Sequence, residues 1–188
     1  MYVKEMDLVK SQNNVTLLRR ILYMIIATLV LAVSSKIKIP FYPVPMTMQT
    51  FVVLFIGIVF GWKMGLATIS LYLMEGLVGL PVFAGTPEKG VGIVYFMGPT
   101  MGYLIGFLAA CFFAGYFSYN KNIILNFIKL LFATSLIYVF GIIWLGNIIG
   151  FDKPLLKLGL YPFAVAEIFK IVLLTLVATK IKNLKSYI

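Results

Sequence analysis

Two ionisable residues lie inside an apolar stretch near the C-terminus of this 188-residue chain. The stretch, PFAVAEIFKIVLLTLVAT at residues 162–179, contains Glu167 and Lys170, and its composition is typical of a transmembrane helix. Ionisable residues are rare in such helices and usually face a cavity, a partner or a transport pathway. A spacing of three residues places both side chains on one helical face, where a carboxylate accepts and an ammonium donates hydrogen bonds. The pair could hold a small polar ligand, or it could be an ion pair that only stabilises helix packing.

The residue types on which most hydrolytic enzymes depend are scarce. The sequence has no histidine, which excludes Ser-His and Cys-His nucleophilic dyads and removes the commonest zinc ligand. It has only six carboxylates, and they form no cluster suited to a metal ion or to paired acid–base catalysis. We therefore expect no enzymatic activity, no catalytic residues, no metal site and no cofactor.

The composition predicts a protein that lies in a lipid bilayer. Hydrophobic residues make up 62% of the chain and charged residues only 12%, with a mean hydropathy of +1.03. The predicted class is an all-α integral membrane protein, one transmembrane domain over residues 1–188 with six transmembrane helices. The six apolar spans cover about residues 17–35, 46–60, 64–78, 96–116, 123–149 and 162–179.

The basic residues predict the orientation. The net charge is +10, but these residues flank the spans and form no single surface, which argues against nucleic-acid binding. Six spans place both termini on one side, which carries ten basic residues against five on the other, so we expect cytoplasmic termini. The ten are Lys4, Lys10, Arg19, Arg20, Lys63, Lys121, Lys129, Lys180, Lys182 and Lys185. The five are Lys36, Lys38, Lys89, Lys153 and Lys157.

The outer connections predict where a ligand site could lie. The connection Gly79–Tyr95 is long and mostly apolar, so it is either a lid over an outward-facing pocket or a structural plug. Thr47 and Gln49 lie near the outer start of the second span, where they could bind a ligand, or cap the helix and sit at the interface. Because the sixth span also begins at this side, these residues could converge with Glu167 and Lys170 on one shallow outward cavity.

Four segments of the sequence together resemble the BioY family. They are PFYPVPMTMQTFVVLFIG at residues 40–57, YLMEGLVGLPVFAG at 72–85, GPTMGYLIGF at 98–107 and PFAVAEIFK at 162–170. Members of this family are the biotin-specific substrate-binding (S) components of energy-coupling-factor (ECF) vitamin transporters. The resemblance implies six membrane helices and a biotin site near the extracellular face, under the first and third outer loops and partly over the sixth helix.

The resemblance also implies roles for individual residues. In the family, the acidic residue and the lysine of the last segment contact the ligand, and they correspond to Glu167 and Lys170. A carboxylate can accept from a ureido N–H of biotin, and an ammonium can donate to the ureido oxygen. We expect the thiophane ring and the valeryl chain to lie against apolar walls such as Phe83 and Tyr103.

The expected function is biotin uptake across the bacterial cytoplasmic membrane by a multi-pass protein. The chain has no GxxxxGK[ST] phosphate loop, so uptake is driven either by partner ECF ATPases with a coupling subunit or by this chain alone. Two departures from the family pattern bear on this. Glu167 replaces the usual aspartate, which keeps open a different vitamin as the ligand. The Ala-xxx-Ala docking motif of the first helix has only Thr28 and Ala32 as its best match.

Overall fold

The computed structural model describes residues 2–86, 88 and 90–180. Lys89, Lys182 and Lys185, which entered the charge comparison, lie outside the described residues. Within them the chain forms seven helices and one two-stranded antiparallel pair. The elements are α1 (Tyr2–Lys36), β1 (Lys38–Ile39), β2 (Met46–Thr47), α2 (Gln49–Leu77), α3 (Ile93–Phe96), α4 (Met101–Tyr116), α5 (Ile123–Ile149), α6 (Leu155–Gly159) and α7 (Tyr161–Ala178).

The first helix is longer than the predicted span. It begins at Tyr2 and not near Leu17, because no glycine or proline interrupts residues 2–36. The chain then enters the proline-rich connection, where β1 and β2 pair Lys38 with Thr47 and Ile39 with Met46. This short hairpin returns the chain to the bundle and delivers Thr47 to the start of α2.

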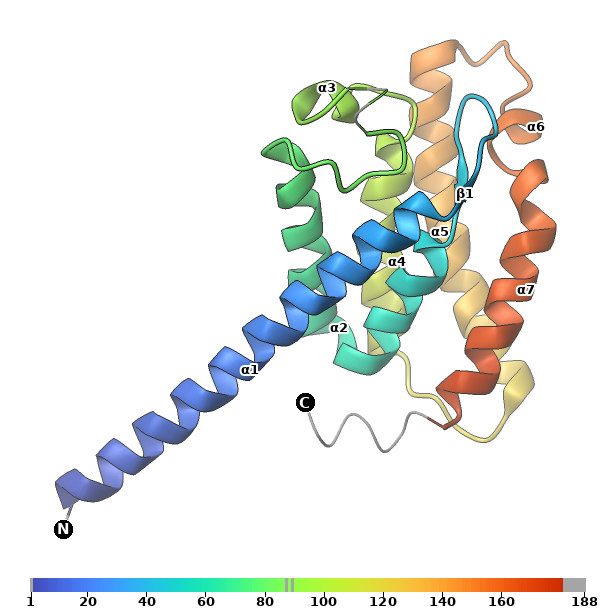
Figure 1. The fold of residues 1–188 in the computed structure, drawn as a ribbon. Coiled ribbons are helices and arrows are strands. Elements are labelled where there is room, and N and C mark those ends of the chain that lie inside the picture. The colour runs from blue at the N-terminus through green and yellow to red at the C-terminus, as the bar shows by residue number, and fades with distance from the viewer. Residues whose placement is uncertain (1, 87, 89, 181–188) are drawn as a thin grey trace.

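The element α2 consists of two helical arms joined at Gly61. Gly61 has φ 74° and ψ 170°, a conformation that favours glycine and stops the helix. Figure 1 shows the chain reversing here, so that the second arm runs back beside the first. A Cβ atom placed on Gly65 would lie 3.5 Å from the Cα of Gly57, which shows how closely the arms approach. The sequence predicted two separate spans in this region, divided at residues 61–63.

The remaining helices follow the apolar runs with one clear exception. α5 covers residues 123–149 as predicted, and the side chain of Asn122 caps it by accepting from the backbone N–H of Leu125 at 3.0 Å. α4 begins at Met101, five residues after the start of about Phe96 that was predicted for the fourth span. The proline at position 99 disfavours helical backbone at the preceding residue, so the short α3 ends before the long helix begins.

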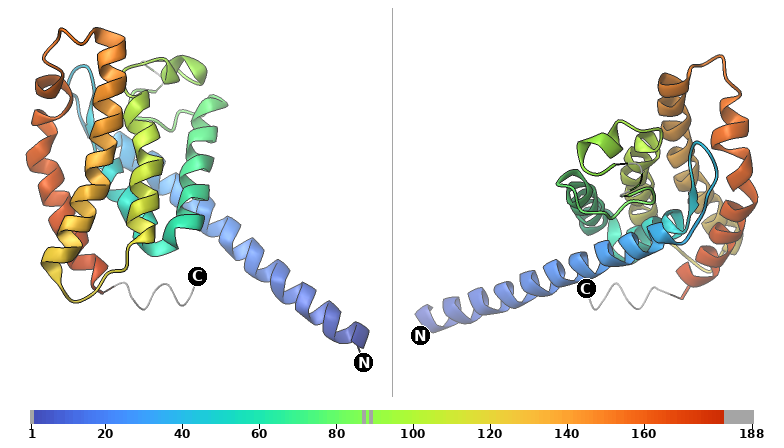
Figure 2. Two further views of the ribbon diagram at one scale, coloured as in Figure 1. Left: turned by 180° about the vertical axis from the view of Figure 1, so that it is seen from behind. Right: turned by 45° about the horizontal axis from the view of Figure 1, so that its top comes forward.

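The arms of α2 pack with α4, α5 and α7 into a bundle, and α1 crosses its side obliquely (Figures 1 and 2). α4 and α5 approach closely at Gly106, which has no side chain to keep them apart. A Cβ atom placed on Gly106 would lie only 2.6 Å from the Cα of Ile137. The β1–β2 connection, the α2–α3 loop and α6 gather at one end of the bundle (Figure 1). These three segments, far apart in the sequence, therefore come together over the helix ends.

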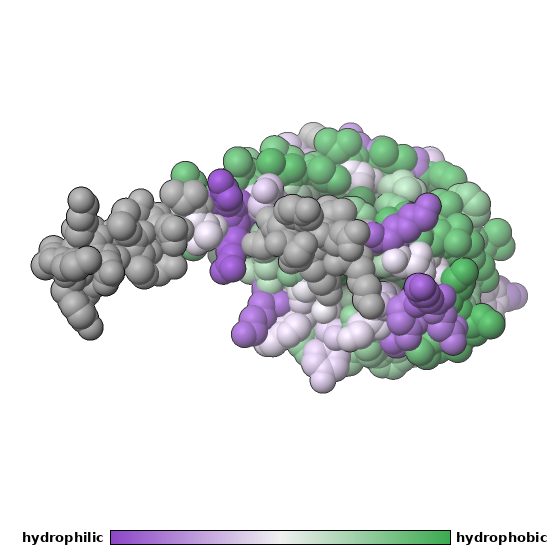
Figure 3. Space-filling view, turned by 90° about the horizontal axis from the view of Figure 1, so that it is seen from below, coloured by the Kyte–Doolittle hydropathy of each residue, from purple (hydrophilic) through white to green (hydrophobic). Residues whose placement is uncertain are grey.

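The surface agrees with a protein embedded in lipid. Among the described residues, four helical stretches are long and apolar enough to cross a membrane, namely 16–36, 49–77, 123–149 and 161–178, and α4 is a shorter apolar helix. Viewed from the end opposite to the gathered loops, polar residues occur on the end face and apolar residues cover the flanks (Figure 3). Lys63, Lys121 and Lys180 are exposed. The findings thus support a multi-pass, all-helical membrane protein.

Candidate functional site

The two charged residues of α7 form a buried ion pair. The Nζ atom of Lys170 lies 2.7 Å from Oε1 of Glu167, and each side chain is only 7% exposed. Pro162 near the start of α7 and the apolar run behind it keep this region helical, so residues three apart share a face. The pair lies on the face turned toward α2, because both residues contact Thr50.

All three N–H groups of the Lys170 ammonium already donate hydrogen bonds within the protein. Besides Glu167, its Nζ atom donates to Oγ1 of Thr50 at 3.0 Å and to the backbone oxygen of Thr47 at 2.6 Å. Thr50 in turn donates to Oε1 of Glu167 at 2.9 Å. Lys170, Thr50 and Glu167 are thus joined in a closed ring of hydrogen bonds, which we call the polar ring. An ammonium has three N–H groups, so Lys170 can bind a ligand only by exchanging one of these partners.

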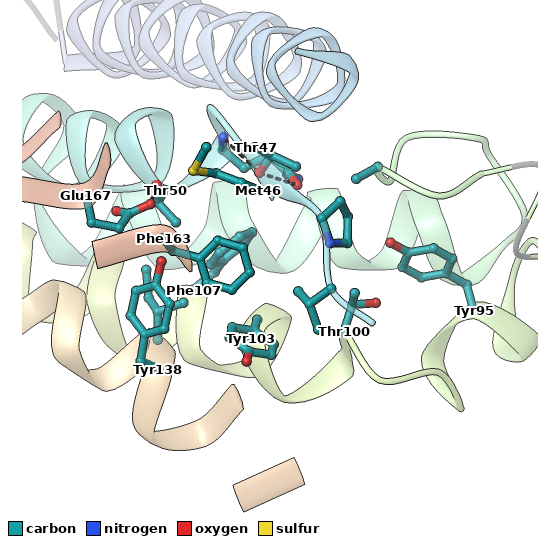
Figure 4. Close-up of a pocket in the computed structure, with 15 residues that line it drawn as sticks. Met46, Thr47, Thr50, Tyr95, Thr100, Tyr103, Phe107, Tyr138, Phe163 and Glu167 are labelled. Carbon is teal, nitrogen blue, oxygen red and sulfur yellow. Dashed lines mark hydrogen bonds between the residues drawn. The ribbon is translucent and has the colours of Figure 1, made fainter. Parts of the chain in front are cut away.

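Glu167 retains a free acceptor. Its Oε2 atom is the one buried side-chain oxygen or nitrogen among the described residues that has no hydrogen-bond partner. The hydroxyl of Tyr138 points toward this carboxylate (Figure 4). A buried acceptor without a donor is destabilising, and a ligand N–H placed here would satisfy it. The arrangement is therefore suited to a neutral ligand that presents an N–H group.

A small cavity lies beside the polar ring, between α2, α4, α5 and α7. Its volume is about 50 Å³. Its walls are formed by these four helices together with the β1–β2 connection and the segment from the α2–α3 loop to the start of α4. The lining residues are Val44, Pro45, Met46, Thr47, Gln49, Thr50, Ala84, Tyr95, Thr100, Tyr103, Phe107, Ile137, Tyr138, Phe163 and Glu167.

The cavity has two polar ends and an aromatic middle (Figure 4). Glu167 lies with Thr50 at one end, and Tyr95 with Thr100 at the other. The Tyr95 phenol is a neutral hydroxyl at neutral pH, and burial raises its pKa further above the ordinary value. The middle is formed by aromatic rings. An elongated ligand with an apolar body and polar groups at both ends matches this layout.

The structure brings most of the predicted site residues together. Thr47, Gln49, Tyr103 and Glu167 line the cavity, and Lys170 lies directly behind Glu167. Gln49 donates to the Tyr72 hydroxyl at 2.6 Å, and the hydroxyl of Tyr103 donates to the backbone oxygen of Gly159 at 2.9 Å. The hydroxyl of Thr47 is bonded within its own turn to Gln49, at 3.2 Å.

Phe83 is not brought to the cavity. Its ring is 1% exposed and stacks on Tyr95 with centroids 4.9 Å apart, while its edge meets Tyr72 at 5.3 Å. A Cβ atom on Gly76 would overlap this ring, so Gly76 provides the space in which it sits. Phe83 thus packs the α2–α3 loop onto α2 and α3, and the neighbouring Ala84 lines the cavity.

Several lining residues were missed from the sequence. Tyr138 lies in an apolar span, and a search for polar side chains inside spans would have found it. Phe163 belongs to the same segment as Glu167. Phe107 and Thr100 carry no local signal, because only the packing of α4 against its neighbours brings them to the cavity.

Comparisons with known proteins give consistent results. The family model described as "BioY family" matches residues 6–187. A "Probable biotin transporter BioY" from Pyrococcus horikoshii is 36% identical over 152 residues, covering 81% of this chain and 89% of the relative. A "Biotin transporter BioY" from Thermotoga maritima is 33% identical over 161 residues, covering 85% and 94%. A crystal structure of "the S-component for biotin from an ECF-type ABC transporter" matches with a TM-score of 0.74 and 26% identity, over 90% of this chain and 94% of that one.

Proposed function

The chain belongs to the BioY family, and on this premise we propose that it binds biotin in the cavity beside Glu167 and carries it into the cell. The observation that carries the proposal is the unpaired Oε2 of Glu167, a buried acceptor at the polar end of a cavity with aromatic walls. Relatives similar over most of this chain are named biotin transporters, and a biotin S-component has a similar fold.

The chemistry of the cavity suits the ureido group of biotin. A ureido N–H can donate to Oε2 of Glu167, and Tyr138 and Thr50 provide further polar groups at the same end. Lys170 holds the carboxylate and the backbone of Thr47, and it can reach the ureido oxygen after releasing one partner. The ring system and the valeryl chain then lie along Phe163, Phe107 and Tyr103. Phe83 acts behind the wall as a packing residue of the loop.

We place this single domain in the bacterial cytoplasmic membrane with six crossings and both termini inside. The two arms of α2 on either side of Gly61 account for two of the crossings. Labelling of single cysteines in oriented vesicles tests this arrangement. Lys157→Cys is expected to react with a membrane-impermeant maleimide from outside, and Lys121→Cys only after the membrane is opened. Reaction of Lys121→Cys in sealed, right-side-out vesicles would contradict the orientation.

The first helix bears on whether a partner drives transport. Thr28, which stands in the best match to the family's docking motif, is 1% exposed and donates to Glu75 at 2.8 Å. Its side chain is turned to the bundle and is not presented to an ECF coupling subunit. This favours transport by the chain alone, which biotin uptake by proteoliposomes containing only this protein would test. Uptake that appears only when ATPases and a coupling subunit are added would assign it to a complete ECF complex.

Titration calorimetry of the purified chain in detergent tests the ligand. Biotin is expected to bind with one site per chain and to release heat from hydrogen bonding. Glu167 in place of the family's aspartate moves the carboxylate by about one methylene length. Because a shifted acceptor can suit a different ligand, the second candidate is another vitamin in the same cavity. A competition panel of thiamine, riboflavin and lipoate separates the two. Binding of any of these in place of biotin would refute the first proposal.

A further inference from the structure

The loop between α2 and α3 is held by side chains from the end of α1 and from β1. Residues 82–86 form no helix or strand, so their carbonyl groups need donors from elsewhere. Ser35 donates to the Val82 oxygen at 2.8 Å, and Lys38 donates to the Ala84 oxygen at 2.6 Å. We refer to residues 82–86 as the lid segment.

Lys36 makes the most extensive of these contacts. Its Nζ atom donates to the backbone oxygen of Phe83 at 2.8 Å, and to the backbone oxygen and Oγ1 of Thr86 at 3.1 and 3.3 Å. One ammonium thus joins both ends of the turn that contains Ala84. A second link lies about two turns lower on α1, where Thr28 donates to Glu75 near the end of α2. The outer half of α1 is therefore bonded to the segment from Glu75 to Thr86 at four positions.

The lid segment is also a wall of the cavity. Ala84 lines it directly, and Phe83 stacks on Tyr95, which lines it as well. The Tyr72 hydroxyl donates to the Val82 oxygen at 2.8 Å and accepts from Gln49, another lining residue. Since the cavity has a volume of about 50 Å³ and sites for small molecules usually exceed about 300 Å³, its walls must move to admit a ligand.

The lid segment is the wall of the cavity to which α1 is bonded, so it is the wall that a movement of α1 displaces. α1 packs against α2 and crosses the bundle obliquely, with its N-terminal part projecting beyond the other helices (Figures 1 and 2). Its lipid-facing residues, such as Leu29 at 60% and Val33 at 64% exposure, provide no polar attachment to the bundle. A tilt of α1 therefore acts on the lid segment through Ser35 and Lys36, and through Lys38 of the adjoining β1.

We propose that α1 and the lid segment move as one unit, with Lys36 as a positioning residue that holds the lid closed over the cavity. The position of α1 then sets how fast a ligand leaves. This inference rests on the proposed function for the identity of the ligand. The coupling between α1 and the lid segment can be tested without any ligand.

The first test measures the dissociation of radiolabelled biotin from the purified full-length chain. Lys36→Met is expected to release biotin about tenfold faster, because it removes three charge-assisted hydrogen bonds that this exposed lysine makes to the lid. Lys36→Arg keeps donors in place and is expected to restore most of the slow release. Lys153→Met, at an exposed lysine paired only with Asp152 in the described structure, is the matched control and should not change the rate. Release from Lys36→Met at the wild-type rate would overturn the proposal.

The second test needs no ligand and detects the coupling itself. Ala84→Cys reports opening of the lid through its rate of reaction with a water-soluble maleimide, and buried Cys111 provides the wild-type background. Adding Thr28→Val, which cuts the lower link to α1, is expected to raise this rate severalfold. Thr175→Val, at an equally buried threonine bonded within its own helix, should not. Equal rates in all variants would refute the coupling, whereas a raised rate in a chain that binds no biotin would support it and refute only the ligand.

Discussion

Replacement of Lys170 by methionine is the perturbation whose effect follows most directly from the structure. Methionine fills a similar apolar volume but removes hydrogen bonds to Thr47, Thr50 and Glu167. It leaves the Glu167 carboxylate 93% buried, since the side chain is 7% exposed, with the hydroxyls of Thr50 and Tyr138 as the neutral groups beside it. Breaking a buried ion pair in this way costs about 3–5 kcal/mol, which is a large part of a typical stability of about 5–15 kcal/mol.

A second substitution separates the structural effect from the effect on the ligand. In the double variant Glu167→Gln/Lys170→Met neither charge is left unpaired, so most of the lost stability should return. Biotin binding should not return, because the charged acceptor and the ammonium that positions it are both absent. Lys170→Met alone is expected to weaken binding at least about 100-fold, the equivalent of about 2.7 kcal/mol.

Thermal unfolding and titration calorimetry in the same detergent measure both effects. Lys157→Met, at an exposed lysine of α6, controls for the general effect of losing a positive charge. The reasoning would be refuted if Lys170→Met bound biotin as tightly as the wild type. It would also be refuted if the single and double variants unfolded at the same temperature, since the buried carboxylate would then have no cost.

Three further substitutions test the walls of the cavity and the bundle around it. Gly76→Ala places a Cβ in the space of the Phe83 ring and should weaken biotin binding about tenfold in calorimetry, through the loop. Tyr138→Phe removes a hydroxyl that points toward Glu167 and should weaken binding about 3- to 10-fold without lowering the unfolding temperature. Gly106→Val overpacks the contact with Ile137 and should destabilise the protein by about 1–3 kcal/mol in thermal unfolding. Unchanged affinity in the first two, or an unchanged unfolding temperature in the third, would contradict the assigned contacts.

The apolar runs of the sequence predict where helices lie but not every end. α5 is bounded by Asn122, a side chain that caps the helix, and its limits were predicted correctly. The start of α4 was placed five residues too early, at Phe96, because hydropathy continues across a proline that the backbone does not tolerate inside a helix. The sequence predicted a break between two spans at residues 61–63, whereas the conformation of Gly61 and the close contact of the two arms require the packed structure.

The polar part of the site was easier to predict than the apolar part. Glu167 and Lys170 were identifiable because charges inside a membrane span need a partner. Phe83 shows the limit of the same reasoning, since an aromatic residue in an apolar loop can face either the ligand or the bundle. Gly76, near the end of α2 and in direct contact with the ring, decides this by leaving room for it, and the apolar pattern of the loop does not reveal that contact.

The β1–β2 connection and the lid segment are anchored by different helices, and this has a consequence for binding. Lys170 of α7 holds the first connection through the Thr47 oxygen at 2.6 Å, whereas Lys36 of α1 holds the lid segment through the Phe83 oxygen at 2.8 Å. Lys38 of β1, which pairs with Thr47, also donates to the Ala84 oxygen of the lid at 2.6 Å, so the lid opens only when this bond breaks together with those of Ser35 and Lys36. None of these bonds belongs to the polar ring of Glu167, Thr50 and Lys170. A ligand that enters past Ala84 meets an acceptor already in position, which lowers the ordering cost of binding. Since the acceptor is fixed on α7 and the lid on α1, affinity and release can be altered by separate substitutions.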